Sequence, residues 1–192
     1  MRPDHFYSDP HFGHHNIIRF SDRPFKDVDD MTEGLIARYN EVVAPNEFVL
    51  WCGDASMKIS VPQFREIRDR LNGDMGLVRG NHDPKSISKC LNMGFDFVVE
   101  EMFLRMGSRV CRVKHYPYAL SPQQKRYLIE RGHHIDDRYP DLRPPRVKGE
   151  VLIHGHTHQS HKVEGTMVHV GVDAWDYRPV PWTQVADLVS QI

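Results

Sequence analysis

Residues 7–16 read YSDPHFGHHN and place Asp9, His11, His14 and His15 within one short stretch near the N-terminus. Aspartate and histidine titrate, bind metals and resist burial, so a fold that gathers them needs partners elsewhere in the chain. The preceding residues 5–8 (HFYS) have the composition of a short strand. If other strand-like runs end in similar polar groups, this stretch marks one part of a larger site.

Four later strand-like runs also end in polar groups, at residues 53–54 (GD), 80–83 (GNHD), 115 (H) and 154–158 (HGHTH). In an α/β sheet, ligands bind in the crevice outside the carboxyl ends of the strands. Glycines at the strand ends let the backbone turn sharply and approach closely. Five strand ends could therefore deliver these side chains to one place.

Helical patterns alternate with these runs and predict an α/β layered domain. Apolar residues recur at helical intervals in residues 29–43, 61–71, 84–91, 121–131 and 179–192. Residues 95–106 and 109–114 read as two strands joined by Gly107-Ser108, and residues 162–172 read as a hairpin. Residues 133–148 are expected to form an ordered surface loop.

The composition is typical of a soluble globular protein. The chain has 192 residues, 40% hydrophobic and 27% charged, which predicts one domain over residues 1–192. No apolar run approaches the roughly 20 residues of a membrane span. The N-terminus has no apolar signal core, so we expect a cytoplasmic protein with no membrane partner. The net charge of -1 and the pI of about 6.9 give no general drive toward stable nucleic-acid binding.

Histidine is frequent in this chain, whereas cysteine is scarce. There are 13 histidines, and the three cysteines (Cys52, Cys90 and Cys111) form no CxxC pair. A disulfide framework and a thiolate zinc site are therefore not expected. A metal site here would use nitrogen and oxygen ligands, which suit manganese, iron or zinc. One carboxylate could bridge two such cations, as in two-metal hydrolases.

The individual motifs differ in how much they indicate. An isolated DxH or GD is common, and its simplest explanation is a turn aspartate beside a surface histidine. GNHD is more specific, and GHTH after an apolar strand is more specific still, because these residues serve a β-structure poorly. The ordered set DxH, GD, GNHD, H, GHTH favours a metal site over a histidine-rich solvated surface.

With this ordered set, residues 9–158 resemble the calcineurin-like metallophosphoesterase family. The segments SDPHFGHHNIIRF and RPF resemble a group of small bacterial and phage members, and GVDAWDYRPVPW resembles the usual C-terminal segment. The resemblance implies a four-layer α/β/β/α sandwich. It also implies a metal-dependent phosphoric ester hydrolase with two divalent transition-metal ions, of which manganese is favoured over iron or zinc.

The resemblance assigns four ligands to each metal, with Asp54 as the shared bridge. The first set is Asp9, His11, Asp54 and His158, and the second set is Asp54, Asn81, His115 and His156. A metal-bridging hydroxide would attack phosphorus in line, without a protein nucleophile.

Two residues beside Asn81 are expected to act in catalysis. His82 would protonate the leaving oxygen or steady the phosphate. Asp83 would either orient the His82 ring or cap the following helix.

The expected substrate is a small phosphodiester, with cyclic or short nucleotides as the leading candidates. Residues 53–60 (GDASMKIS) lack the GD-x-x-D-R-G pattern of protein serine/threonine phosphatases, and the chain is too short for the capping domains of larger nuclease relatives. The alternatives are a phosphomonoesterase or a nuclease at the same site. A non-catalytic scaffold of the same fold is the alternative from another class. The roles of His14, His15 and residues 133–148 and the oligomeric state are left open.

Overall fold

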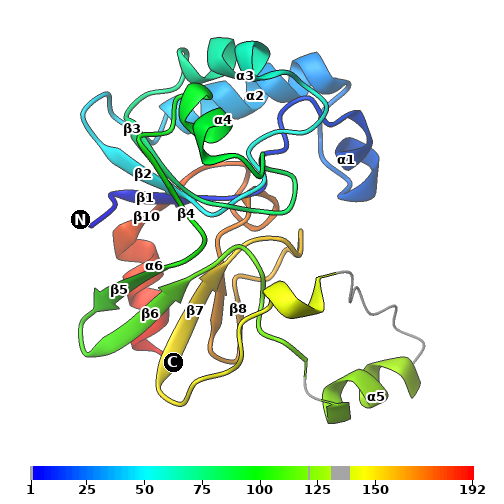
Figure 1. Ribbon diagram of the computed structural model, residues 1–192, viewed down its shortest axis with the longest axis vertical. Helices are drawn as coiled ribbons and strands as arrows, with labels where there is room; N and C mark the ends of the chain where they lie inside the picture. Colours follow the sequence, from blue (N-terminus) through cyan, green and yellow to red (C-terminus); the bar gives the residue numbers. More distant parts are fainter. Residues whose placement is uncertain (1, 121, 131–138) are drawn as a thin grey trace.

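Two five-stranded sheets form the centre of the computed structural model, which describes residues 2–120, 122–130 and 139–192 (Figure 1). The first sheet has the order β10–β1–β2–β3–β4, with β1 at His5–Tyr7, β2 at Phe48–Trp51, β3 at Asp74–Val78, β4 at Phe97–Val99 and β10 at Val180–Pro181. The second has the order β5–β6–β7–β9–β8, with β5 at Met102–Met106, β6 at Arg109–Val113, β7 at Glu150–His154, β8 at Val163–Glu164 and β9 at Met167–His169. The predicted α/β layered fold is confirmed.

Six α-helices and two short 3-10 helices accompany the sheets in the described ranges. The α-helices are α1 His15–Phe20, α2 Val28–Asn40, α3 Val61–Arg68, α4 Ile87–Asn92, α5 Pro122–Glu130 and α6 Trp182–Ser190. The 3-10 helices are η1 Pro140–Leu142 and η2 Val172–Ala174. No helix among the described residues has the length and apolar character needed to cross a bilayer.

The strands that carry the predicted site are parallel within each sheet. β1, β2, β3 and β4 pair in parallel, and β10 is antiparallel to β1. In the second sheet, β6, β7 and β9 pair in parallel, flanked by antiparallel β5 and β8. Parallel strands end at the same edge of a sheet. The segments that follow β1, β2 and β3 therefore leave one edge of the first sheet, and the segments that follow β6 and β7 leave one edge of the second sheet.

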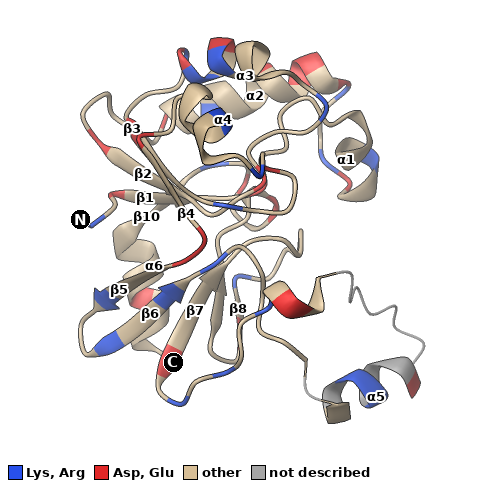
Figure 2. Cartoon of the chain, in the orientation of Figure 1, with Lys and Arg blue, Asp and Glu red and all other residues tan. Residues whose placement is uncertain are grey.

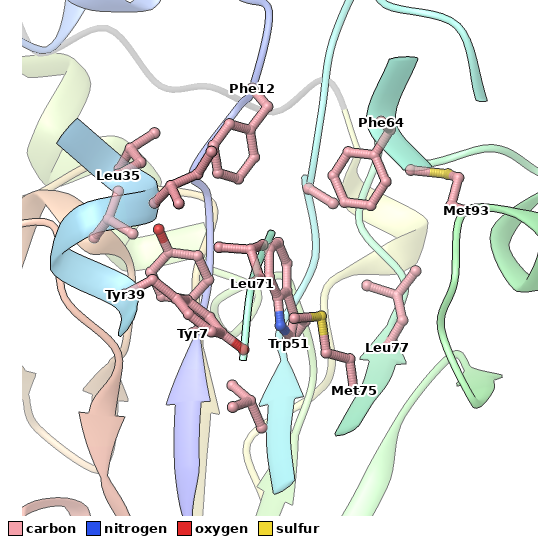
Figure 3. Packing of buried hydrophobic residues seen from close by; sticks show 14 of the residues in the cluster. Tyr7, Phe12, Leu35, Tyr39, Trp51, Phe64, Leu71, Met75, Leu77 and Met93 are labelled. Carbon is pink, nitrogen blue, oxygen red and sulfur yellow. The ribbon is translucent and has the colours of Figure 1, made fainter. Parts of the chain in front are cut away.

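Strand β2 contributes to two cores because alternate side chains point to opposite faces of a sheet. Val49 and Trp51 lie in the core between the first sheet and helices α2, α3 and α4, where Trp51 packs near Phe64 (Figure 3). Leu50 and Cys52 lie in the core between the two sheets. This placement on both faces explains why residues 48–52 are continuously apolar.

Helix α2 shows how the sequence forms its local structure. The Asp27 carboxylate caps it by accepting hydrogen bonds from the backbone N–H groups of Asp29 and Asp30. Met31, Leu35 and Tyr39 recur every four residues, so they share one helix face, which is buried against the first sheet. Residues 29–43 were expected to be helical, and the helix ends at Asn40, ahead of Pro45.

The segment 95–106 is one predicted strand that the structure divides into two. β4 pairs with β3 in the first sheet, and β5 pairs with β6 in the second. The chain crosses between the sheets at Glu100 and Glu101, whose carboxylates bond to Arg79 and Arg112. The apolar pattern continues on both sides of this crossing, so hydrophobicity alone does not reveal the break.

Other differences lie at the two ends of the chain and near residue 130. Helix α1 and strand β10 were not predicted, and both are short. The predicted helix 121–131 is α5, and Ser121 and Arg131 lie outside the described residues. Of the predicted loop 133–148, residues 133–138 lie outside the described part, and the remainder contains η1.

Candidate metal centre

The predicted site residues gather in two adjoining clusters at the carboxyl ends of β1, β2, β3, β6 and β7. Two groups of three side chains could each hold a metal ion, and within each group the potential ligand atoms lie within 4.8 Å of one another. The first cluster is Asp9, His11 and His158, and the second cluster is Asp54, His115 and His156.

Asp54, a member of the second cluster, also lies close to the first cluster. Its Oδ2 atom is 3.5 Å from Nε2 of His11 and 3.4 Å from Nε2 of His115. The Asn81 side chain joins the second cluster, with Oδ1 3.1 Å from Nε2 of His115. All seven residues that were predicted as ligands are therefore contiguous, and Oδ2 of Asp54 lies close to a histidine of each cluster.

The chemistry of this residue set fits divalent cations. Asp9 and Asp54 are carboxylates that are 0% and 1% exposed, and burying such charges is costly unless they are paired or bind a metal. His11 is buried beside both, yet neither of its ring nitrogens has a hydrogen-bond partner within the described chain. A cation between these groups would satisfy the carboxylates and the imidazole together. The nitrogen and oxygen donors suit first-row transition metals.

The backbone of the two clusters is strained. Asp9, His11, Asp54, His156 and His158 have φ angles between 51° and 72°, in the left-handed region that favours glycine. Each such residue costs roughly 1–2 kcal/mol relative to ordinary backbone conformations. Strain of this kind concentrates at functional sites, where the surrounding structure over-determines it. Its presence at five predicted ligands supports a functional site.

Two glycines make room for the carboxylates. A side chain at Gly80 would collide with Oδ1 of Asp54, and a side chain at Gly155 would collide with Oδ2 of Asp9. The backbone N–H of His156, the next residue, donates to both oxygens of Asp9 at 3.1 and 3.0 Å. Close approach of the β7 end to the β1 loop therefore depends on the absence of a side chain at position 155.

Two of the histidines are oriented by acceptors behind them. His115 Nδ1 is 2.8 Å from the carbonyl oxygen of Cys52, and His158 Nδ1 is 2.8 Å from Oδ2 of Asp173. Because each partner is an acceptor, Nδ1 carries the proton in both rings. Nε2 of each ring is then left facing its cluster, which is the arrangement found for metal-binding histidines.

Asp54 and His115 are a buried pair whose pKa values shift in opposite directions. Burial by itself would raise the pKa of Asp54, but attraction to His115 and His11 holds it below its usual range. Burial would likewise lower the pKa of His115, but the Asp54 carboxylate raises it to about 9. A cation that binds to Asp54 and His115 would take the place of the His115 proton.

His82 lies beside the Asp54 carboxylate and is exposed, with 33% of its side chain open to solvent. Its backbone N–H donates to Oδ1 of Asp54 at 2.8 Å, and its ring Nε2 is 3.9 Å from Oδ2 of the same residue. Its ring centroid is 5.3 Å from that of His11. His82 is thus placed at the open side of both clusters.

Asp83 is buried, and in the described part of the chain its carboxylate bonds to backbone N–H groups. It accepts from Asp54 and Gly80 at 2.8 Å and from Ala55 at 2.9 Å. Burial and the nearby Asp54 raise its pKa to about 6. The predicted capping role is wrong, since the N-cap of α4 is Ser86. Asp83 instead joins the segments that follow β2 and β3.

The His14–His15 pair, whose role the sequence left open, divides in the structure. His14 is buried, and its ring centroid lies 5.5 Å from that of His11 and 6.5 Å from that of His82. His15 is exposed at the start of α1. Beside His82, a small cavity of 120 Å³ is lined in part by Lys58, which also has a left-handed backbone (φ 65°).

Arg23 and Asp173 adjoin the first cluster and were not among the predicted site residues. Asp173 holds His158, and Arg23 pairs with Asp173 at 2.8 and 3.0 Å. In the sequence they lie in the RPF and GVD segments, 150 positions apart. The only signal in the sequence was that both segments belong to the family resemblance.

Sequence comparison finds relatives of similar length. No family model matches the chain. An uncharacterised protein of Methanocaldococcus jannaschii is 27% identical over 100% of this chain and 93% of its own length. The gene 66 protein of Mycobacterium phage L5 is 29% identical over 97% of this chain and 94% of its own length.

Comparison with solved structures supports the fold. A protein of unknown function from Aquifex aeolicus has a TM-score of 0.65 at 23% identity, over 96% of this chain and 97% of its own. Yfce, a phosphoesterase from E. coli, gives a TM-score of 0.37 at 15% identity, over 87% of this chain and 76% of its own, which is too low to establish a common fold or function.

Proposed function

We propose that this chain is a dinuclear-metal-dependent phosphodiesterase of the metallophosphoesterase family, with residues 1–192 as one catalytic domain. The observation that carries the proposal is that Oδ2 of Asp54, in the second cluster, also lies 3.5 Å from Nε2 of His11 in the first cluster. The substrate would be a small phosphodiester, with cyclic or short nucleotides as the leading class, and the metals would be manganese or another first-row cation.

Asp9, His11, Asp54 and His158 would hold one cation, and Asp54, Asn81, His115 and His156 the other. When bound, two such cations neutralise the phosphoryl oxygens and lower the pKa of water so that it can attack phosphorus. The protein contributes the buried carboxylates that set the spacing of the two sites. It also contributes the acceptors behind His115 and His158 that keep Nε2 directed at each site.

His82 is the group best placed to act on the substrate itself. Its ring lies next to the bridging carboxylate and is partly open to solvent, so it could reach the leaving oxygen of a bound ester. A proton held at a ring nitrogen would pass to that oxygen as the P–O bond breaks. Lys58, which lines the same cavity as His82, would offer a cationic group for a non-reacting phosphate oxygen.

Two features favour a small diester over the alternatives. Arg23, the guanidinium behind the first cluster, is already bonded to Asp173 and to two backbone carbonyls, so it is not available to clamp a dianionic phosphomonoester. The net charge of -1 gives no general drive toward nucleic-acid binding, and Figure 2 shows Asp and Glu as well as Lys and Arg in both halves of the described chain.

The test is a hydrolysis screen of manganese-loaded protein. We expect hydrolysis of bis(p-nitrophenyl) phosphate and of at least one cyclic nucleotide or dinucleotide, with p-nitrophenyl phosphate much slower. Asp54→Asn should abolish the activity and bind less manganese. Activity on the monoester alone would replace the diesterase by a phosphomonoesterase. A purified protein that binds no transition metal and hydrolyses nothing would favour the scaffold.

A further inference from the structure

A buried ion pair lies behind the first cluster and joins distant parts of the chain. Arg23, between α1 and α2, and Asp173, in η2, bond through Nε–Oδ1 at 2.8 Å and Nη2–Oδ2 at 3.0 Å. Their side chains are 0% and 6% exposed. A buried ion pair is weak evidence for stability alone, because desolvation offsets much of the attraction. Arg23 and Asp173 are therefore expected to have a second role, and their other hydrogen bonds indicate what it is.

The guanidinium of Arg23 also holds the backbone of the first cluster. It donates from Nη2 to the carbonyl oxygen of Asp9 and from Nη1 to that of Pro10, each at 2.8 Å. Asp9 and His11 on either side of Pro10 have φ angles of 59° and 54°. Arg23 thus fixes the carbonyls of a loop whose strained conformation turns both the Asp9 and the His11 side chains toward the cluster.

The carboxylate of Asp173 holds the third member of the first cluster. Its Oδ2 accepts the Nδ1–H of His158 at 2.8 Å, while the same carboxylate stays bonded to Arg23. His158 itself has a φ of 51°, so its ring orientation depends on this contact as well as on its backbone. The Arg23–Asp173 ion pair therefore helps to position all three members of the first cluster.

The second cluster is held by different groups. His115 is oriented by the carbonyl of Cys52, and the Asp54 carboxylate accepts the backbone N–H of His82. The buried Asp83 carboxylate joins the backbone segments on which Asp54 and Gly80 lie. These contacts do not involve Arg23 or Asp173. The supports of His115 and Asp54 are thus distinct from the Arg23–Asp173 pair, while the His156 N–H bonded to the Asp9 carboxylate links the two clusters.

We infer that Arg23 and Asp173 are positioning residues for the metal held by the first cluster, and that weakening the pair selectively empties that half of a dinuclear centre. The inference rests on the proposed function in requiring two metals, but it concerns binding and not hydrolysis. Removing a partner behind a metal ligand typically lowers metal affinity by roughly 10–100-fold.

The variant Asp173→Asn tests this inference. Asparagine removes the charge and one of the two oxygens that Asp173 shares between Arg23 and His158. Binding of Mn²⁺ to metal-free protein should be followed by isothermal titration calorimetry and by electron paramagnetic resonance. We expect wild-type protein to bind two ions and give the spectrum of a spin-coupled pair. The variant should retain one tight ion, with a six-line mononuclear spectrum at one equivalent and a second site weakened roughly 10–100-fold.

Two further variants complete the design. Arg23→Lys keeps a positive charge but loses the forked donor, and it should weaken the same site if Asp173→Asn folds poorly. Asp176→Asn, which removes the exposed acid that pairs with Arg178, is the matched control and should bind two ions as wild type does. Thermal unfolding of each metal-free variant verifies that it is folded.

The outcomes separate this inference from the proposed function. If wild type binds two ions and the Arg23 and Asp173 variants do the same with unchanged affinity, the inference is wrong and the dinuclear centre stands. Equal weakening of both sites would show a general structural role and would also overturn it. A wild-type protein that binds no manganese, zinc or iron would overturn both.

Discussion

His82 is exposed, whereas the seven candidate metal ligands are buried or of intermediate exposure, and its backbone is held in place. The N–H of His82 bonds to Asp54, so replacing the side chain leaves that contact in place. A substitution at this position therefore separates the chemistry of the imidazole from the assembly of the two clusters.

We predict that His82→Gln lowers kcat/KM in proportion to how poor the leaving group is. For a nucleoside leaving group, which needs a proton, the loss should be about 10²–10⁴-fold. For p-nitrophenolate, which leaves without protonation, the loss should be small. The measurement is kcat/KM for a dinucleotide and for bis(p-nitrophenyl) phosphate. His15→Gln, at an exposed neighbouring histidine, is the control, and an equal loss on both substrates would rule out the proton donor.

At the scale of elements, the centre depends on how closely the end of β7 approaches the loop after β1. Gly155 lies against the side chains of Ser8 and Asp9, and the adjacent N–H of His156 bonds to the Asp9 carboxylate. The two segments belong to different sheets, so this contact is also where the sheets meet at the site.

We predict that Gly155→Ala displaces the Asp9 carboxylate, because the added methyl group would overlap it. Overpacking of this kind typically destabilises by about 1–3 kcal/mol, and manganese binding to the first cluster should weaken with it. Urea unfolding and a manganese titration measure the two effects. Gly149→Ala is the control: its φ is 82° but no atom lies within 4 Å of the added group, so it should lose stability without losing metal. Unchanged manganese binding in Gly155→Ala would contradict the prediction.

At the scale of the whole molecule, two buried histidines link folding to pH. His154 in β7 and His169 in β9 are paired in register, and their ring centroids are 5.3 Å apart. Burial lowers the pKa of His154 to about 4 and that of His169 to about 3. Neither ring nitrogen of His169 has a hydrogen-bond partner in the described chain, so the fold provides no acceptor for a second proton.

We predict that the metal-free protein loses stability as the pH falls below 6.5. The unfolded histidines take up protons near pH 6.5, whereas His154 and His169 in the folded state do so only near pH 4 and 3, so acid favours unfolding. Each contributes a slope approaching about 1.4 kcal/mol per pH unit between these limits. The free energy of unfolding, measured with urea from pH 7.5 to 4.5, should fall less steeply with decreasing pH in His169→Leu than in wild type. The difference in slope should be about 1.4 kcal/mol per pH unit. An unchanged slope in His169→Leu would refute the assignment of this pH dependence to His169.

The sequence by itself determined which residues could form a metal site and where they lie along the chain. Polar groups after apolar runs at positions 9, 54, 81, 115 and 156 predicted strand ends, because buried strands must be apolar and ligands gather where they end. The helix faces followed in the same way from apolar spacing, as Met31, Leu35 and Tyr39 illustrate. These features depend on local composition, which a sequence displays directly.

Only the tertiary structure decided what holds those residues in place. Five predicted ligands have a left-handed backbone although none of them is a glycine, so the residue types gave no sign of this conformation. Contacts from other segments impose it. The crossing at Glu100 and Glu101 depends on which sheet offers each strand a partner. The pairing of Arg23 with Asp173, across 150 positions, joins segments that no periodicity relates. Long-range contacts of this kind are set by how the chain folds back on itself, so the sequence could indicate the candidate ligands but not the residues that support them.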